Sequence, residues 1–317
     1  MCAVTSDSYY IFMEKPTQRA IVVAGPTASG KTTLGVQLAS LLDGEIISAD
    51  SRQVYRGLDI GSGKDLEEYT LAGRTIPYHL IDITDLSTEY SVFHYQQAFY
   101  GVYEDICRRG RLPLIVGGTG MYLEAALSAY QLQPTPRNDA LREELAVLDD
   151  DSLAARLAAA RPNLHNETDL VDRARLLRAI EIAEYARDHP PLPAPQIRTL
   201  NLVIMYPPAL LRERIARRLR ERLAGGLIEE VEALHDQGFS WERLQSLGLE
   251  YRYTSEYLQG IIKTRNDLFQ KLNSAIAQFA KRQRTWFRGM ERRGFIIHWL
   301  PGADLSAALK IIREEPL

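Results

Sequence analysis

The feature that most constrains how this chain can fold is a glycine-rich segment at residues 25–32, with the sequence GPTASGKT. It matches the pattern G-x-x-x-x-G-K-[ST] and lies between an apolar run, AIVVA at residues 20–24, and a helical spacing of apolar residues at 31–42. The backbone amides of such a loop curl around an anion at the positive end of the helix dipole. The sequence therefore predicts a phosphate-binding loop between a strand and a helix.

Each residue type in this loop has a predicted task. The glycines let backbone N–H groups approach the anion, Lys31 adds a cation, and the Thr32 hydroxyl is placed to ligate Mg²⁺ held by the phosphates. The motif does not distinguish a pyrophosphate ester from ATP. The predicted phosphate-binding residues are Gly25, Pro26, Thr27, Ala28, Ser29, Gly30, Lys31 and Thr32.

Strand-like and helix-like segments alternate along the first third of the chain, which indicates an α/β fold with a doubly wound parallel sheet. Strands are predicted at residues 20–24, 45–48, 79–83, 112–116, 200–205 and 294–300. The stretch at 138–187 is rich in helix formers. We therefore expect a P-loop core beginning at residues 1–136, a small helical insertion at 137–189, and the completion of the core with a helical C-terminal region at 190–317.

The composition is that of an ordinary globular protein of 317 residues, 45% hydrophobic and 25% charged. The net charge of −3 excludes a uniformly basic nucleic-acid binder but not a local basic face. Two cysteines cannot form a disulfide framework. We recognise no secretory signal and no apolar window long enough to span a membrane, so a cytoplasmic protein is expected.

Two further segments follow predicted strands and would lie at the sheet edge where ligands of such folds bind. Asp50 and Ser51 follow the second strand, and Asp50 suits three roles: a Mg²⁺ ligand, a base, or the cap of a turn. The fourth strand ends in GGTG at residues 117–120, where a kinase or ATPase often has an acidic residue. Asp82 is the other acidic candidate, so an ordinary ATPase metal site has weak support.

Six segments resemble, in this order, those of the tRNA dimethylallyltransferases: GPTASGKT, DSRQVYRGLDIG, PYHLID, LIVGGTGMYL, RAIE and FAKRQRTWFR. The resemblance implies transfer of a dimethylallyl group from dimethylallyl diphosphate to the N6 amine of the adenosine 3′ of the anticodon, giving N6-isopentenyladenosine and diphosphate. It also implies that the phosphate loop holds the diphosphate rather than ATP, that Mg²⁺ is the cofactor, and that the helical insertion clamps the anticodon arm of the tRNA.

The same resemblance assigns roles residue by residue. It makes Asp50 the base that accepts the proton of the amine, Thr119 a contact to the leaving-group oxygens, and Lys31 a third catalytic residue. It makes at least one of Arg214 and Arg217, three apart on one predicted helix face, a diphosphate ligand. The tRNA contacts expected are Asp50, Ser51, Arg52, Gln53, Thr119, Arg142, Arg175, Arg178, Lys281, Arg282 and Arg284.

Three segments depart from the commonest pattern of this family. Residues 62–65 read Ser-Gly-Lys-Asp where many members have Thr-Ala-Lys-Pro, and Tyr78 stands where His is frequent. Residues 248–252 read GLEYR where many members have Gly-Tyr-Lys-Glu. These departures concern loop geometry and RNA contacts rather than the reaction.

Three other functions fit part of the sequence. An isopentenyltransferase acting on free AMP or ADP shares the loop and the chemistry but has no need of a basic C-terminal segment. A small-molecule P-loop kinase would need a better acidic residue at a strand end. A non-catalytic RNA-binding protein with a relict loop would not need to keep Lys31, Thr32, Asp50 and Thr119.

We expect the protein to act as a monomer.

The segment at residues 263–293 carries nine basic residues against two acidic ones and yields a testable prediction. Phe279 and Trp286, seven apart on it, are interpreted as the core stripe of a helix rather than as base-stacking groups. The affinity for tRNA should fall steeply with rising salt, because each neutralised phosphate releases condensed counterions. Filter binding at several salt concentrations measures the slope, and a flat dependence would contradict a basic tRNA-binding face.

Overall fold

The computed structural model describes residues 19–128, 132, 135–160, 172–189 and 195–315. The chain divides into two compact units, one formed by Met1–Ser128 with Gln196–Leu317 and the other by Ala129–Pro195. The predicted insertion at 137–189 falls within the second unit. Within the described ranges, no helix is long and apolar enough to cross a membrane.

A six-stranded sheet forms the centre of the first unit. Its strands are β1 (Arg19–Ala24), β2 (Gly44–Ala49), β5 (Tyr78–His79), β6 (Leu112–Gly117), β7 (Arg198–Ile204) and β8 (Ile297–Leu300), in the spatial order β5-β2-β6-β1-β7-β8. Every pairing in it is parallel. The inner strands are buried along nearly their whole length, as expected where both faces are covered. The predicted α/β fold with a parallel sheet is confirmed.

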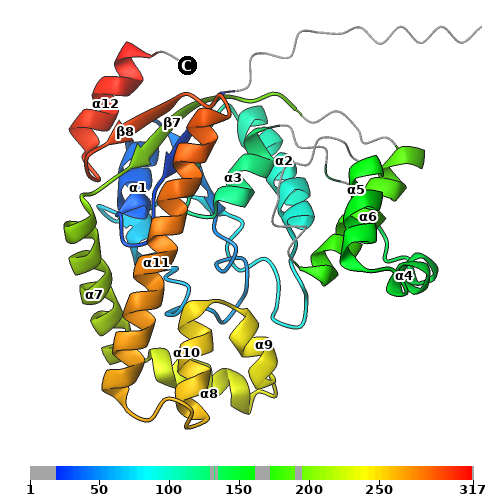
Figure 1. Ribbon diagram of the computed structural model, residues 1–317. Coiled ribbons are helices and arrows are strands. Elements are labelled where there is room, and N and C mark those ends of the chain that lie inside the picture. The colour runs from blue at the N-terminus through cyan, green and yellow to red at the C-terminus, as the bar shows by residue number, and fades with distance from the viewer. Residues whose placement is uncertain (1–18, 129–131, 133–134, 161–171, 190–194, 316–317) are drawn as a thin grey trace, which may run out of the picture. The chain divides into compact units, whose positions relative to one another are not determined.

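Helices cover both faces of this sheet (Figure 1). They are α1 (Lys31–Leu41) and α12 (Leu305–Glu314) on one face, and α2 (Val92–Arg108), α3 (Gly120–Leu127) and the long α11 (Arg265–Arg292) on the other. Along β1, Ile21 and Val23 enter the apolar cluster of the first face, whereas Ala20 and Val22 enter that of the second. Alternate residues of one strand therefore support two separate cores.

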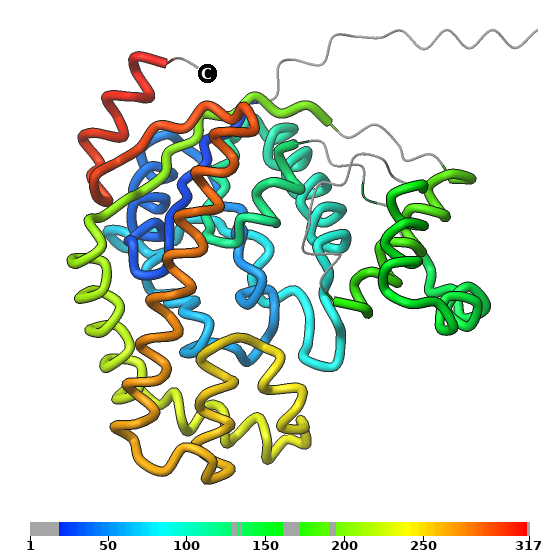
Figure 2. The backbone as a smooth tube through the Cα atoms, viewed as in Figure 1, coloured from blue at the N-terminus to red at the C-terminus, as the bar shows by residue number. Residues whose placement is uncertain are grey.

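Further helices complete the first unit: α7 (Pro208–Ala224), α8 (Leu227–Asp236), α9 (Trp241–Ser246) and α10 (Leu249–Leu258). Figure 2 follows the backbone through this region, where α11 contacts both α7 and α10. A short 3-10 helix (Leu66–Tyr69) and the two-stranded sheet of β3 (Thr70–Leu71) and β4 (Arg74–Thr75) precede β5.

A carboxylate on α8 anchors the loop that follows β2. Glu230 accepts hydrogen bonds from the backbone N–H groups of Asp59, Ile60 and Gly61, at 3.1, 2.6 and 3.0 Å. The hydroxyl of Tyr251 on α10 donates to the same carboxylate at 2.8 Å. One anionic side chain thus satisfies three consecutive backbone donors and fixes the course of this loop.

The second unit is helical in its described part. Its helices are α4 (Asp139–Ala146), α5 (Asp150–Ala160) and α6 (Arg173–Asp188). They share an apolar core that includes Leu145, Leu153, Leu157 and Ile180.

The structure corrects two sequence interpretations. The strand predicted at 79–83 is limited to β5, because Leu80 and Asp82 have φ angles of 61° and 55°, which a strand cannot continue. The interpretation of Phe279 as a core residue is wrong, since its side chain is 39% exposed. The buried stripe of α11 instead comprises Leu268, Leu272, Ile276, Ala280, Gln283, Phe287 and Met290. The sequence pattern does not predict α3, α9, α10 and α12 as separate helices.

Two helical glycines with opposite surroundings test the packing of α1 on β6. A Cβ at Gly35 would lie 2.6 Å from Val116 Cγ2, whereas nothing lies within 4 Å of a Cβ at Gly101 in α2. Gly35→Ala should lower the free energy of unfolding by about 1–3 kcal/mol, because overpacking outweighs the gain in helix propensity. Gly101→Ala should raise it by up to about 1 kcal/mol. Urea denaturation measures both, and a stabilised Gly35→Ala protein would contradict this packing.

Candidate functional site

The predicted phosphate loop follows β1 directly and ends where α1 begins, at Lys31. Positive φ angles at Ala28 (60°) and Gly30 (82°) shape it, and Gly30 is the N-cap of α1. No side chain caps this helix end, so its first N–H groups are available to an anion. The hydroxyl of Ser29 is buried and has no hydrogen-bond partner among the described residues. In the described part of the chain, the first N–H groups of α1 and the Ser29 hydroxyl are therefore donors without a partner at the start of this helix.

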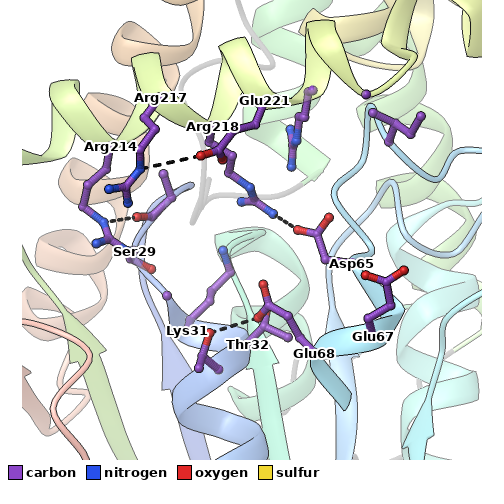
Figure 3. A pocket seen from close by; sticks show the side chains of 16 residues that line it. Ser29, Lys31, Thr32, Asp65, Glu67, Glu68, Arg214, Arg217, Arg218 and Glu221 are labelled. Atoms are coloured by element: carbon purple, nitrogen blue, oxygen red, sulfur yellow. Dashed lines mark hydrogen bonds and ion pairs between the residues drawn. The ribbon is translucent and has the colours of Figure 1, made fainter. Parts of the chain in front are cut away.

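A cavity of about 510 Å³ opens at this loop (Figure 3). Lys31 and Thr32, at the start of α1, line one side of the cavity. Helix α7 contributes four arginines to the lining. Its charged lining residues are Lys31, Arg214, Arg217, Arg218 and Arg222, with Asp65, Glu67, Glu68 and Glu221. The cations exceed the carboxylates by one, so the cavity suits an anionic ligand.

The two arginines predicted as diphosphate ligands have different surroundings in the structure. Arg214 is half-buried and donates from Nε to the carbonyl of Ala28 at 2.7 Å, while its guanidinium lies 4.8 Å from the Tyr206 ring centroid. Arg217 is exposed, and its Nε lies 3.9 Å from Glu221. Arg214 is therefore held against the phosphate loop, whereas Arg217 extends along the cavity rim (Figure 3).

Sequence reasoning missed two further arginines of this cavity. Arg218 forms an ion pair with Asp65, and Arg222, with 11% of its side chain exposed, lies 3.4 Å from the carboxylate of Glu250. The signal was present in the sequence, because Arg214, Arg218 and Arg222 are four residues apart and share one face of a helix.

The departures at 62–65 and 248–252 meet beside these arginines. A Cβ at Gly63 would overlap the Arg222 guanidinium, so the glycine makes room for it. Asp65 and Glu250 are the acidic partners of Arg218 and Arg222. Two segments that look unrelated in the sequence therefore form one charged network at the cavity.

Lys31 lies at the centre of this charge pattern. Desolvation by the surrounding protein is the main cause that lowers the pKa of its ammonium to about 8. The carboxylate of Asp50 opposes this shift, while the cationic Arg218 and Arg222 add to it. An anion bound in the cavity would favour the charged form of Lys31.

Asp50 and Thr119 stand at the ends of the neighbouring strands β2 and β6. Oδ1 of Asp50 accepts the backbone N–H of Arg52 at 2.9 Å. The Thr119 hydroxyl accepts the backbone N–H of Ser51 at 3.1 Å, and the Thr119 N–H donates to the carbonyl of Ala49 at 3.1 Å. Both side chains are half-buried and fixed by backbone groups, so the structure brings these two predicted catalytic residues together.

Gln53 and Asp82 are engaged inside the loops that follow the strands. The buried Gln53 amide accepts from the Ser48 hydroxyl at 2.9 Å and donates to a backbone carbonyl at 3.1 Å. Asp82 pairs with the buried ammonium of Lys64, which also contacts Asp59 at 2.6 Å. The acidic alternative considered for an ATPase metal site is thus part of an internal ion pair.

The cations predicted to contact RNA have different surroundings. On α11, Lys281 and Arg282 are exposed, whereas Arg284 is half-buried and donates to the Met205 sulfur at 3.1 Å. Ser51 and Arg52 are half-buried at the end of β2.

In the second unit, two of the three predicted arginines hold a buried carboxylate. Arg142 donates to Glu181 at 2.7 and 2.9 Å, and Arg178 does so at 3.1 Å. Hydrogen bonding to Arg142 is the main reason why the pKa of Glu181 is lowered to about 2. Arg175 is exposed. In the structure Arg142 and Arg178 thus hold Glu181 inside the second unit. Their contact with RNA stays a prediction.

The fold and the site together define the class of the protein, an α/β protein with a P-loop-like fold. The sequence model of the family described as IPP transferase matches residues 53–290, and that described as isopentenyl transferase matches residues 18–84. The chain belongs to the IPP transferase family.

Curated relatives cover almost the whole chain. The tRNA dimethylallyltransferase 1 of Geotalea uraniireducens is 55% identical over 92% of this chain and 96% of its own length. The tRNA dimethylallyltransferase 2 of Syntrophotalea carbinolica is 56% identical over 90% of this chain and 95% of its own.

Solved structures agree with this relationship. A tRNA isopentenylpyrophosphate transferase from Bacillus halodurans is 29% identical with a TM-score of 0.66, covering 94% of this chain and 95% of that one. A eukaryotic dimethylallyltransferase acting on tRNA is 25% identical with a TM-score of 0.74, covering 93% of this chain and 78% of that one.

The lowered pKa of Lys31 predicts that anion binding depends on pH. The affinity for pyrophosphate should fall from about pH 7 to about pH 9, because Lys31 loses the proton whose charge attracts the anion. Isothermal titration calorimetry across this range measures it. Lys31→Met is the control: it should bind about tenfold more weakly at pH 7 and show only the titration of pyrophosphate itself. Equal pH slopes for both proteins would contradict the role of Lys31.

Proposed function

We propose that the protein transfers the dimethylallyl group of dimethylallyl diphosphate to the N6 amine of the adenosine 3′ of the anticodon in tRNA, releasing diphosphate. The observation that carries this proposal is the placement of Asp50 and Thr119 at the strand ends beside the phosphate loop, in a chain of the IPP transferase family. Such a site joins a cradle for a phosphorylated leaving group to a carboxylate that accepts a proton.

The leaving group requires the most support from the protein. The lone pair of an adenine N6 amine is delocalised into the ring, so the amine is a weak nucleophile and the diphosphate must leave readily. Fixed positive charge where negative charge develops lowers the barrier. Lys31 supplies such a charge, the loop amides and the Ser29 hydroxyl supply hydrogen-bond donors, and Arg214 is already held at the loop by the carbonyl of Ala28. These groups need little rearrangement when the substrate binds.

Asp50 is the base in this proposal. Its Oδ1 accepts the N–H of Arg52, which fixes the orientation of the carboxylate at the end of β2. The carboxylate accepts the proton of N6 as the C–N bond forms, because the amine becomes acidic at that stage. The Thr119 hydroxyl, held by the N–H of Ser51, contacts the oxygens of the leaving group.

Mg²⁺ is the cofactor in this proposal, and the donor set fits it. Mg²⁺ prefers oxygen ligands and usually keeps waters and substrate phosphates in its shell. The Thr32 hydroxyl lines the cavity at the start of α1 and would hold the ion together with oxygens of the diphosphate. When bound, the ion would neutralise charge on the diphosphate.

The RNA partner is the anticodon stem-loop of a tRNA. Exposed Lys281 and Arg282 on α11 and Arg175 on α6 supply cations for its phosphates. The target adenosine must leave its stack to reach a half-buried Asp50, at a cost of a few kcal/mol. We propose that the enzyme acts as a monomer in the cytoplasm.

The alternatives have less support. The isopentenyl transferase model matches residues 18–84, whereas the IPP transferase model extends to residue 290 and so includes most of α11. A kinase often has a metal-binding carboxylate where β6 ends, but glycines and Thr119 stand there, and Asp82 is paired with Lys64.

A labelling experiment tests the proposal against its alternatives. The protein is incubated with dimethylallyl diphosphate labelled in its allyl group, together with unmodified tRNA, AMP and ATP. We expect label in the tRNA, at the adenosine next to the anticodon, and none in AMP. Label in AMP would establish the free-nucleotide reaction instead, and phosphoryl transfer from ATP would establish a kinase.

The base assignment has its own test. Asp50→Ala should lower the single-turnover rate by about 10²–10⁴-fold, while the dissociation constant for tRNA stays near that of the wild type. Asp85→Ala is a matched control, because Oδ1 of Asp85 makes the same kind of bond, to the N–H of Ser87 at 3.0 Å. If both variants lost the same modest fraction of the rate, Asp50 would be a turn cap and not the base.

A further inference from the structure

A buried amide on α11 joins the two loops of the site. Gln283 is 8% exposed, and its Oε1 accepts the backbone N–H of Thr27 at 2.9 Å. Its Nε2 donates to the carbonyl of Gly118, also at 2.9 Å. Thr27 belongs to the phosphate loop after β1, and Gly118 belongs to the turn after β6. One side chain therefore spans the point at which the two loops face each other.

The turn after β6 is shaped to receive this amide. A Cβ at Gly118 would lie 2.8 Å from Nε2 of Gln283 and 3.4 Å from Cε of Lys31. Glycine at this position thus lets the amide and the Lys31 side chain approach the same backbone. Thr119 follows directly, so a shift of this turn would move its hydroxyl relative to the phosphate loop.

The helix that carries Gln283 is anchored to the same region at two more points. Arg293 donates to the carboxylate of Glu124 on α3 at 2.6 and 2.9 Å. The indole of Trp286 packs so closely on Gly120 that a Cβ there would overlap it. Since α11 is held to α3 at two points just beyond the turn, Gln283 has a rigid base from which to hold both loops.

We infer that Gln283 is a positioning residue, which sets the phosphate loop at the separation from Thr119 that the transfer requires. Thr27 donates its N–H to Gln283, so the loop takes its shape before a ligand arrives. The amide is suited to this task because it offers a donor nitrogen and an acceptor oxygen within a single rigid plane. The inference rests on the proposed function, since it concerns the geometry of that same reaction.

Methionine at this position removes both hydrogen bonds while keeping a side chain of similar length. Gln283→Met should lower the single-turnover rate of allyl transfer about 100-fold, because a small misplacement of reacting groups is costly. Its KM for tRNA should stay within about twofold of the wild type. Gln96→Met is the matched control: Gln96 is 2% exposed and donates to the carbonyl of Ala125 at 2.6 Å. It should destabilise the fold similarly and keep its rate.

Gln283→Glu adds a readout that a purely structural role would not move. A protonated carboxyl can donate from one oxygen and accept at the other, as the amide donates from Nε2 and accepts at Oε1, whereas a carboxylate has no donor for the Gly118 carbonyl. The rate of Q283E relative to the wild type should therefore rise as the pH falls from about 8 to about 5.5, because repulsion by the carbonyl favours the protonated form.

Two outcomes would overturn the inference: equal rates for Gln283→Met and Gln96→Met, or a flat ratio between Q283E and the wild type across this pH range. A wild-type protein that transfers no label to tRNA would instead overturn the proposed function. The two failures are thus distinguishable in one set of assays.

Discussion

The parallel pairing of β6 with β1 on one side and with β2 on the other is the constraint on which the site depends. In this register Gly117 is the partner of both Ala24 and Ala49, so the three strands end at one level. A side chain at Gly117 would overlap the carbonyl of Ala49, and glycine lets the strands close. The phosphate loop, Asp50 and the turn with Thr119 begin at the next residues. Their proximity therefore follows from sheet register.

The charges around the cavity are arranged in pairs before any ligand arrives. Arg218 is opposite Asp65 and Arg222 is opposite Glu250, while Arg214 is bound to a loop carbonyl. Pairing limits the repulsion between cations that lie close together on α7, and it holds their side chains near the loop. Burial of the Lys31 ammonium is the main cause of its lowered pKa, and the nearby Arg218 and Arg222 add to that shift.

The sequence predicts best what local patterns determine. The phosphate loop, the inner strands and the helix after the loop depend on neighbouring residues, and each of them is found in the structure where the pattern indicated. Gln283 could not be found this way, because it contacts Thr27 across 256 residues of sequence. The prediction that Phe279 is a core residue was wrong for another reason. Apolar residues on this helix form more than one possible buried stripe, and tertiary packing buries the stripe that contains Phe287.

The carboxylate of Glu230 occupies one of two places in the fold where backbone amides could bind an anion. The three consecutive amides at Asp59, Ile60 and Gly61 form a concave anion site in the same way as the amides of a phosphate loop. Here the protein itself provides the anion, from α8. A phosphorylated compound that enters this region therefore meets the amides of the phosphate loop alone, because Glu230 already occupies the amides at residues 59–61.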